Sequence, residues 1–186
     1  MPHLRMNRRM VATLLLGAPW LARADSDPLQ AHLRAGACAL LLRHAQTVPG
    51  IGDPPGFSLG VCSSQRNLSD EGRAQARRIG KWFKARSLQP RAVRSSAWCR
   101  CQDTAELAFG RHEVWPALNS FFDGQGGEAE QTAQLRAALG RLRAGRFDVW
   151  VTHQVNMSAL TGQRMTMGEG LLVNAQGKMI ARIPFV

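Results

Sequence analysis

The sequence has few acidic residues and few aromatic ones. It contains 13 Asp and Glu against 24 Lys and Arg, a net charge of +11, and only 6% of its residues are aromatic. A basic surface attracts anionic partners such as phosphorylated molecules or nucleic acid. Proteins that bind single-stranded nucleic acid interleave basic and aromatic residues as stacking platforms, and no run of arginines here does so. We therefore interpret the charge mainly as a solvated arginine-rich surface and expect no nucleic-acid partner.

A hydrophobic run long enough to cross a membrane is also missing. The stretch 11–21 is largely apolar but falls short of the roughly 20 residues that a spanning helix needs. It follows three arginines and precedes Ala22-Arg23-Ala24, the small-x-small pattern of a signal-peptide cleavage site. The sequence therefore predicts a signal peptide over 1–24, exported by the Sec or the twin-arginine route, and a periplasmic or secreted location. The mature chain from Asp25, with no membrane span, keeps 20 basic and 13 acidic residues, a net charge of +7.

No internal repeat, linker or low-complexity tract interrupts the remaining sequence. We expect one domain over 25–186, long enough to bury a sizeable core. Of its four cysteines, Cys99 and Cys101 form a C-x-C pair, which differs from the C-x₂₋₄-C spacing of zinc sites. In an exported chain we expect at least one disulfide, although the sequence does not select a pairing. Cys62 with Cys99 or Cys101 would tie the preceding loop to the next helix, whereas we expect Cys38 to be a buried free thiol.

The chain also carries an apolar run that ends in an arginine and a histidine. Residues 37–42 are apolar, Arg43 and His44 follow, and a loop rich in glycine and proline comes next. Such a run between turn signals is typical of a fully buried strand, so the Arg-His pair should emerge at its carboxyl end. In open α/β sheets that end is where ligands bind. Arginine offers a fork of donors for an oxyanion, and histidine can act as nucleophile, base or ligand.

Four segments resemble, in order, the signatures of the histidine phosphatase (phosphoglycerate mutase-like) superfamily, branch 1. They are Leu42-Arg43-His44-Ala45-Gln46-Thr47, Asn67-Leu68-Ser69-Asp70-Glu71-Gly72-Arg73-Ala74-Gln75-Ala76, Ser95-Ser96-Ala97-Trp98-Cys99-Arg100-Cys101-Gln102-Asp103-Thr104-Ala105 and Val151-Thr152-His153. Ala45 stands where the family usually has glycine. The joint spacing is far more specific than any single motif. The resemblance implies a three-layer α/β/α sandwich with a mostly parallel central sheet.

The family mechanism implies a site built from Arg43, His44, Arg100 and His153. His44 would attack phosphorus to give a phosphohistidine, the other three would hold the phosphoryl oxygens, and water would then release phosphate; no metal or other cofactor is required. The usual acid, a glutamate, is replaced by Ser120. Asp123 is the first candidate for the missing general acid and Glu128 the second. If neither serves, the substrate needs a good leaving group, as in a phosphohistidine or an acyl phosphate.

The long loop 48–65 contains seven glycines and prolines, and we expect it to wall the substrate pocket. Arg66 and Asn67 would return polar groups to that pocket, although a surface ion pair is an equal alternative for Arg66. Asn156, after the last signature, is a further candidate substrate contact. The expected substrate is a phosphorylated small molecule or envelope component, and the oligomeric state is not indicated. The leading interpretation is an exported phosphomonoesterase; the alternative is a weak or inactive phosphate-binding module on the same fold, and mutase activity is less favoured.

Overall fold

The computed structural model describes residues 27–124 and 126–185 of the chain, without the side chain of residue 123. The predicted signal peptide over 1–24 lies outside these residues. In the described part, no helix has the length and apolar character needed to cross a bilayer. The strands are β1 (Cys38–Arg43), β2 (Ala92–Ser95), β3 (Glu113–Val114), β4 (Phe147–Thr152), β5 (Gly170–Asn174) and β6 (Met179–Ile183). The α-helices are α1 (Pro28–Ala35), α2 (Asp70–Ala85), α3 (Cys99–Phe109), α4 (Glu128–Leu139) and α5 (Gln154–Thr161). Short 3₁₀ turns are η1 (Cys62–Ser64), η2 (Pro116–Leu118) and η3 (Phe122–Gly124).

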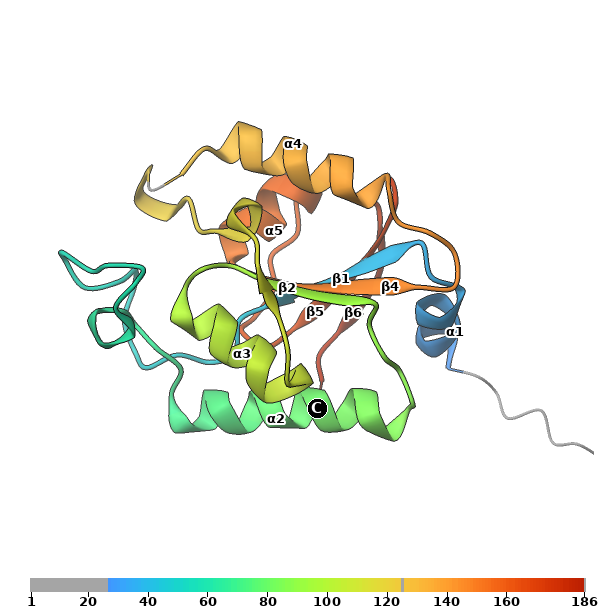
Figure 1. Cartoon of the computed structure of the whole chain (residues 1–186), viewed down its shortest axis with the longest axis horizontal. Coiled ribbons are helices and arrows are strands. Elements are labelled where there is room, and N and C mark those ends of the chain that lie inside the picture. Colours follow the sequence, from blue (N-terminus) through green and yellow to red (C-terminus); the bar gives the residue numbers. More distant parts are fainter. Residues whose placement is uncertain (1–26, 125, 186) are drawn as a thin grey trace, which may run out of the picture.

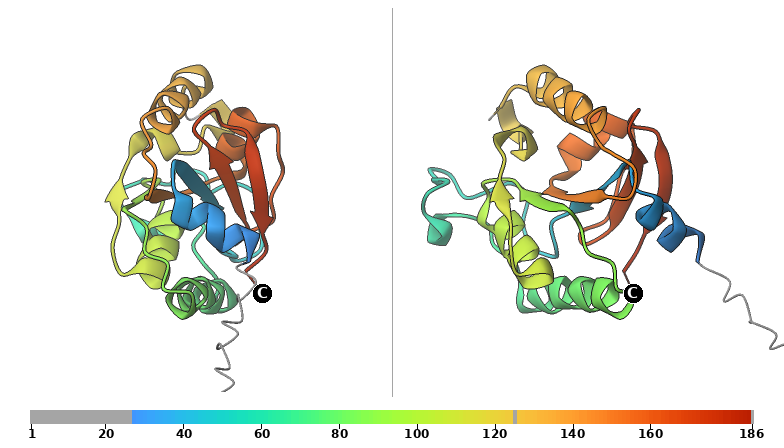
Figure 2. Two further views of the ribbon diagram at one scale, coloured as in Figure 1. Left: turned by 90° about the vertical axis from the view of Figure 1, so that its right-hand side faces the viewer. Right: turned by 45° about the vertical axis from the view of Figure 1, so that its right-hand side comes forward.

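The six strands form one sheet in the order β3-β2-β4-β1-β5-β6, and the four strands from β3 to β1 run parallel. In the described part of the chain, β5 runs antiparallel to both of its neighbours, β1 and β6, and forms a closing hairpin with β6. Helices α2 and α3 cover one face of the sheet and α4 and α5 the other (Figures 1 and 2). The predicted three-layer α/β/α sandwich with a mostly parallel sheet is therefore confirmed.

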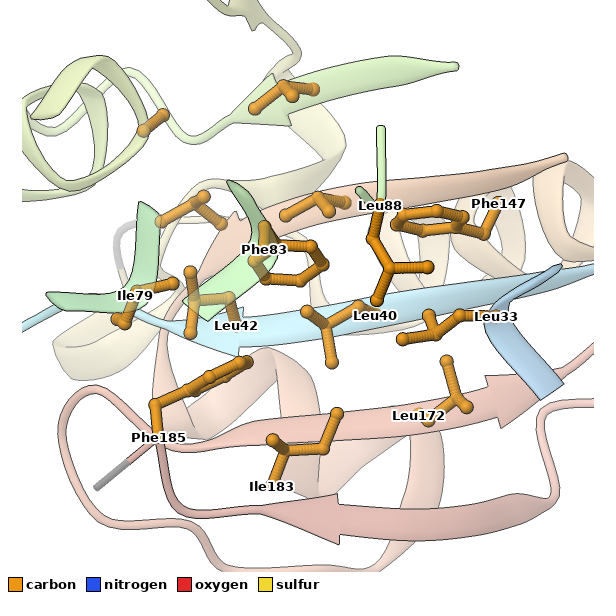
Figure 3. Close-up of a cluster of buried hydrophobic side chains, with 14 of the residues drawn as sticks. Leu33, Leu40, Leu42, Ile79, Phe83, Leu88, Phe147, Leu172, Ile183 and Phe185 are labelled. Carbon is orange, nitrogen blue, oxygen red and sulfur yellow. The ribbon is translucent and has the colours of Figure 1, made fainter. Parts of the chain in front are cut away.

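The apolar run of β1 is continuous because both of its faces are covered. Leu40 and Leu42 pack toward α2, in a cluster with Ile79 and Phe83 (Figure 3). The alternate residue Leu41 joins a second cluster, built with α4 and α5 on the opposite face. Successive side chains of a strand point to opposite faces, so a strand buried on both sides has no polar alternation. This burial fixes the place where the Arg43-His44 pair leaves the core.

Ser69, a favoured N-cap residue followed by two acidic residues, predicts a helix start at Asp70, and α2 begins there. The Ser69 side chain caps the helix by accepting from the Gly72 amide at 3.1 Å, and two acidic residues occupy the first turn. The helical spacing of Gly72, Ala76, Ile79 and Phe83 predicts that they share one face, and these four residues are the buried ones. A Cβ on Gly72 would lie 1.8 Å from the carbonyl oxygen of Gln46. The glycine is thus needed for the close approach of α2 to the chain just after His44.

Two segments differ from the sequence-based expectation. The residues of 112–118 predict a third strand, but β3 has only two residues, and Pro116, which cannot donate to a ladder, begins η2 instead. The spacing of apolar residues over 128–142 predicts one helix, but α4 ends at Leu139, followed by Gly140 at its C-cap, although Leu142 remains buried. Neither difference moves a candidate site residue away from the carboxyl ends of the parallel strands.

Candidate active site

Three neighbouring strands deliver the candidate residues to one edge of the sheet. Arg43 pairs in register with Thr152, and the His44 amide donates to the Thr152 carbonyl at 3.0 Å, so His44 and His153 emerge side by side. The Ser96 amide donates to the Val151 carbonyl at 3.0 Å and leads into α3, which carries Arg100. A pocket of about 700 Å³ opens here, lined among others by Arg43, His44, Arg66, Arg100, Ser120, Glu128 and His153.

His44 is buried and holds its ring in one tautomer. Nδ1 lies 2.9 Å from the carbonyl oxygen of Ala45. A carbonyl can only accept, so Nδ1 carries the proton and Nε2 keeps a free lone pair. Burial, followed by the charge of Arg100, lowers the pKa of His44 to about 3. The imidazole is therefore neutral at physiological pH, with an unprotonated nitrogen available for attack.

His153 lies against His44, with ring centroids 5.4 Å apart. Its Nε2 is 2.8 Å from Ser96 Oγ and 3.4 Å from the sulfur of Cys101. Burial, and then the neighbouring His44, lower the pKa of His153 well below its ordinary value. The Ser96 hydroxyl already accepts from the Trp98 amide, so its hydrogen is available to Nε2. A neutral His153 that accepts at Nε2 carries its proton on Nδ1, where it can donate to an oxyanion.

Arg43 and Arg66 bring two further cations to the pocket. Nη1 of Arg43 donates to the Met165 carbonyl at 2.6 Å, and its buried Nε has no hydrogen-bond partner in the described structure. Nε of Arg66 donates to the Gly52 carbonyl at 2.8 Å, and Nη1 donates to the Thr47 hydroxyl. Burial lowers the pKa of both arginines, and the charge of Arg100 lowers it further. These cations repel one another, so an anion between them would be stabilised.

Arg100 makes a buried ion pair with Asp53 in the loop after β1. Nη1 and Nη2 lie 2.7 and 3.1 Å from the two carboxylate oxygens, and the side chains are 5% and 4% exposed. Asp53 also accepts from the Trp98 indole and the Arg66 amide, each at 2.9 Å. Burial alone would raise the pKa of Asp53, but the hydrogen bonds from Arg100 and Arg66 lower it. No sequence motif points to Asp53; the available signal is that it is the only acid between positions 48 and 69.

The candidate acids occupy different places around the pocket. Glu128, at the start of α4, lines the pocket and is exposed. Asp123 belongs to η3, and its side chain lies outside the described part of the structure. Ser120, at the position where the family has its glutamate, lines the pocket, and its Oγ accepts from the Phe122 amide at 3.2 Å. Glu128 is therefore the only carboxyl group among the described lining residues that is not already held by Arg100.

The two candidate asparagines donate to backbone carbonyls. The Asn67 amide group donates to the Cys62 carbonyl at 2.6 Å, within the loop. Asn156, which is 1% exposed, donates to the Asn119 carbonyl at 2.8 Å, and its Oδ1 lacks a partner among the described residues. Of the described residues, Arg66 lines the pocket, whereas Asn67 and Asn156 do not.

The signature segments have identifiable contacts. Thr104 Oγ1 accepts from the Ala45 amide at 3.0 Å and donates to the Arg100 carbonyl at 2.7 Å, which joins α3 to the His44 segment. Gln75 accepts from the Gln46 amide and donates to the Met167 carbonyl, both at 3.0 Å. These bonds fix the chain on both sides of the histidine. The motif residues outside the pocket thus hold the position of those inside it.

A disulfide fastens the loop that carries Asp53. Cys62 in η1 is bonded to Cys99 at the start of α3, one of the two pairings of Cys62 considered from the sequence. The Cys99 amide also donates to the Gln65 side chain at 2.9 Å. Cys38 is a buried free thiol, as predicted, and Cys101 is the second free cysteine of the described chain. The loop, which extends beyond the carboxyl end of β1 in Figure 1, is therefore anchored next to Arg100.

Comparisons with known proteins agree with this fold. The chain is similar in fold to the protein histidine phosphatase SixA solved as a complex with tungstate, with a TM-score of 0.54 and 17% identity over 78% of this chain and 96% of that one. It is also similar to TTHB049 from Thermus thermophilus, with a TM-score of 0.54 and 19% identity over 78% of this chain and 98% of that one. A putative phosphohistidine phosphatase SixA from Agrobacterium tumefaciens gives a TM-score of 0.55 and 19% identity over 78% and 97% of the two chains.

Among curated proteins, no significant match is found. The family model of the histidine phosphatase superfamily (branch 1) matches residues 39–161, which include His44, Arg100 and His153. This span is more than half of the chain and contains the strands and helices that form the pocket. The protein belongs to branch 1 of the histidine phosphatase superfamily.

Proposed function

We propose that the protein is a phosphatase that hydrolyses a phosphomonoester through a phosphohistidine on His44. The observation that carries this proposal is the neutral His44 ring, whose Nδ1 is occupied by the Ala45 carbonyl and whose Nε2 is free in a pocket lined by four arginines. A neutral imidazole nitrogen is a competent nucleophile, and phosphoryl transfer needs mainly positioning and charge stabilisation.

The reaction has two steps. Nε2 of His44 forms a bond to phosphorus while the bond from phosphorus to the leaving oxygen breaks, and that oxygen takes up a proton. Arg43, Arg100 and the Nδ1–H of His153 stabilise the charge on the remaining phosphoryl oxygens. Water then attacks phosphorus, the bond to Nε2 breaks, and inorganic phosphate leaves. The residues used for these steps belong to the chain itself, and the scheme includes no metal.

Glu128 and Asp123 are the proposed sources of the proton for the leaving oxygen. Asp53 is unsuited to this role because its pKa is lowered by its hydrogen bonds and it therefore stays ionised. A Glu128→Gln variant should lose activity toward an alkyl phosphate, a poor leaving group, and keep it toward p-nitrophenyl phosphate. Asp123→Asn is the parallel variant. If neither changes the ratio of the two rates, the proposed substrate becomes one with a good leaving group, such as the phosphohistidine suggested by the similarity to SixA.

The decisive experiment is a single-turnover assay with p-nitrophenyl phosphate, followed by intact-mass measurement of the protein. Wild type should give a burst of p-nitrophenol and gain the mass of one phosphoryl group, and His44→Ala should give neither. His112→Ala is the matched control, because His112 lies between α3 and β3 and contacts Gln102 and Glu106. A burst of equal size in His44→Ala would disprove the proposed nucleophile.

The second candidate is a phosphate-binding module without turnover. Its support is Ser120 at the position of the family acid, together with the engagement of Asp53 by Arg100. Such a protein would bind tungstate, a tetrahedral oxyanion, and form no phosphoenzyme. The same assay, with tungstate titration beside it, separates the two functions.

We also propose that the protein is exported to the periplasm or secreted, with a mature chain of one domain that begins at Asp25. The support is the pattern of the first 24 residues and the Cys62–Cys99 disulfide, a bond typical of oxidising compartments. Expression of the full chain in a bacterium, cell fractionation and N-terminal sequencing test this proposal. A cytoplasmic protein that retains residues 1–24 would contradict it.

A further inference from the structure

We propose that Asp53 is a positioning residue for Arg100: its carboxylate holds one edge of the guanidinium so that the other edge faces the phosphoryl group. This inference rests on the proposed function, since it assigns a task to Arg100 at the His44 pocket. Asp53 comes from the loop after β1 and Arg100 from the first turn of α3. Their side chains are 4% and 5% exposed, and both residues line the pocket.

The donors of Arg100 divide into two sets. Its Nη1 donates to Asp53 Oδ1 at 2.7 Å and to the Arg66 carbonyl at 3.3 Å, and its Nη2 donates to Asp53 Oδ2 at 3.1 Å. Nε is buried and has no hydrogen-bond partner in the described structure. A guanidinium has five N–H groups in a fixed plane, so the bonds to Asp53 leave Nε–H and the second Nη2–H side by side. These two donors form the fork that matches two oxygens of a phosphoryl group.

Arg100 also acts electrostatically on the nucleophile. After burial, the charge of Arg100 is the largest cause of the lowered pKa of His44, so the guanidinium lies close to the nucleophile. Nε of Arg43 is also buried and unpartnered within the described residues. Unpaired buried donors are unfavourable, and an oxyanion between the two arginines would satisfy both.

The contacts of Asp53 argue against a second explanation, in which its carboxylate only occupies the place of the phosphoryl group until substrate binds. Besides Arg100, its two oxygens accept from the indole Nε1 of Trp98 and from the backbone amide of Arg66. Arg66 lines the pocket and Trp98 is buried against His153, so the carboxylate would lose both donors if it moved away to admit a ligand. The disulfide between Cys62 and Cys99 further fastens its loop to the helix of Arg100. Asp53 is therefore built in as a fixed part of the site.

The test compares Asp53→Asn with Asp148→Asn. Asp148 makes an equivalent two-pronged pair with Arg91, with distances of 2.9 and 2.6 Å, but at the start of β4, the opposite end from His153. The affinity for inorganic phosphate is measured by calorimetry, and the rate of phosphoenzyme formation by single turnover at saturating p-nitrophenyl phosphate. Asp53→Asn should weaken phosphate binding and slow phosphoenzyme formation by about 10- to 100-fold, as loss of a group that orients a ligand-binding residue commonly does. Asp148→Asn should lower stability and leave both quantities near wild type.

An NMR measurement separates positioning from a general effect on folding. In wild type the Nε–H resonance of Arg100 should shift on addition of phosphate, and in Asp53→Asn this shift should be lost. If Asp53→Asn fails to fold, Trp98→Phe removes one donor that holds Asp53 and should cause a smaller loss of phosphate affinity in the same direction.

Unchanged or tighter phosphate binding in a folded Asp53→Asn protein would overturn the inference. The carboxylate would then have no effect on phosphate binding or would compete with the ligand. Wild-type protein that binds phosphate but forms no phosphoenzyme would overturn the proposed phosphatase function only. The phosphate affinities would still decide the role of Asp53.

Discussion

Ser96 Oγ lies 2.8 Å from Nε2 of His153. The serine hydrogen has a second acceptor, Asn119 Oδ1, but at the longer distance of 3.3 Å. Donation to Nε2 places the imidazole proton on Nδ1. The serine therefore selects the tautomer in which His153 can donate to an oxyanion.

Ser96→Ala should slow phosphoenzyme formation up to about tenfold, because a net hydrogen bond is worth about 1 kcal/mol and its loss frees the alternative tautomer. The ¹⁵N chemical shifts of His153 measure the tautomer directly, and we expect them to move toward a protonated Nε2. Ser95→Ala is the control: Ser95 is fully buried next to Ser96, and its hydroxyl has no hydrogen-bond partner in the described structure. Equal rates for the Ser96 and Ser95 variants would contradict this assignment.

The two buried histidines predict how stability depends on pH. The pKa of His44 falls to about 3 in the folded protein, against about 6.5 in an unfolded chain, and that of His153 is also lowered. Below pH 6.5 the unfolded state therefore binds protons that the folded state does not. The free energy of unfolding should fall with decreasing pH, by about 1.4 kcal/mol per pH unit for each such histidine. For His44 this loss continues down to about pH 3.

Urea unfolding of wild type and His44→Gln between pH 7 and pH 5 measures this effect. The variant should show a shallower pH slope, by the contribution of one histidine. His32→Gln is the matched control, since His32 lies on α1 away from the pocket. Parallel slopes for wild type and His44→Gln would show that His44 takes up a proton equally in both states.

The residues that the sequence located best are those that follow a periodic or ordered pattern. The runs of β1 and β4 are apolar because both faces of the sheet are covered, and each run ends where a histidine enters the pocket. The stripe of α2 was predicted residue by residue for the same reason, because burial of one face imposes the helical period. The ordered signatures then fixed the family, and through it the fold.

The contacts that the sequence did not reveal join positions far apart without any period. Asp53 and Arg100 are 47 positions apart in the chain, and the irregular loop between β1 and η1 sets their pairing. Ser96 stood within a recognised signature, yet its role depends on the direction of one ring nitrogen. Helix α1 was not predicted, because its eight residues bury only Leu33 and leave a weak pattern. Pairing across loops and side-chain orientation require coordinates.

The Cys62–Cys99 disulfide predicts a large effect of reduction. It closes a loop with a sequence separation of 37 residues, for which chain-entropy arguments give a stabilisation of about 4 kcal/mol. A reductant should therefore lower the unfolding midpoint of wild type substantially. The Cys38→Ala variant, which keeps the disulfide, should respond to the reductant as wild type does. A Cys62→Ala/Cys99→Ala variant should start from the lower midpoint and show no response; a response there would indicate another disulfide.

Replacing Gly72 by alanine should destabilise the protein, the opposite of the usual effect of this substitution in a helix. Replacing a glycine in a helix by alanine ordinarily stabilises a protein by up to about 1 kcal/mol. At Gly72 the added Cβ would meet the Gln46 carbonyl oxygen at 1.8 Å, so α2 or the chain after His44 must move. Gly72→Ala should therefore destabilise the protein by about 1–3 kcal/mol, as overpacking typically does, and should reduce phosphoenzyme formation.

At Gly140 the nearest atom to an added Cβ is 3.7 Å away, an ordinary contact, so Gly140→Ala should leave activity unchanged and stability equal or higher. Urea unfolding and single-turnover rates of the two variants decide the matter, and a Gly72→Ala protein as stable and active as Gly140→Ala would show that α2 does not fix the position of His44.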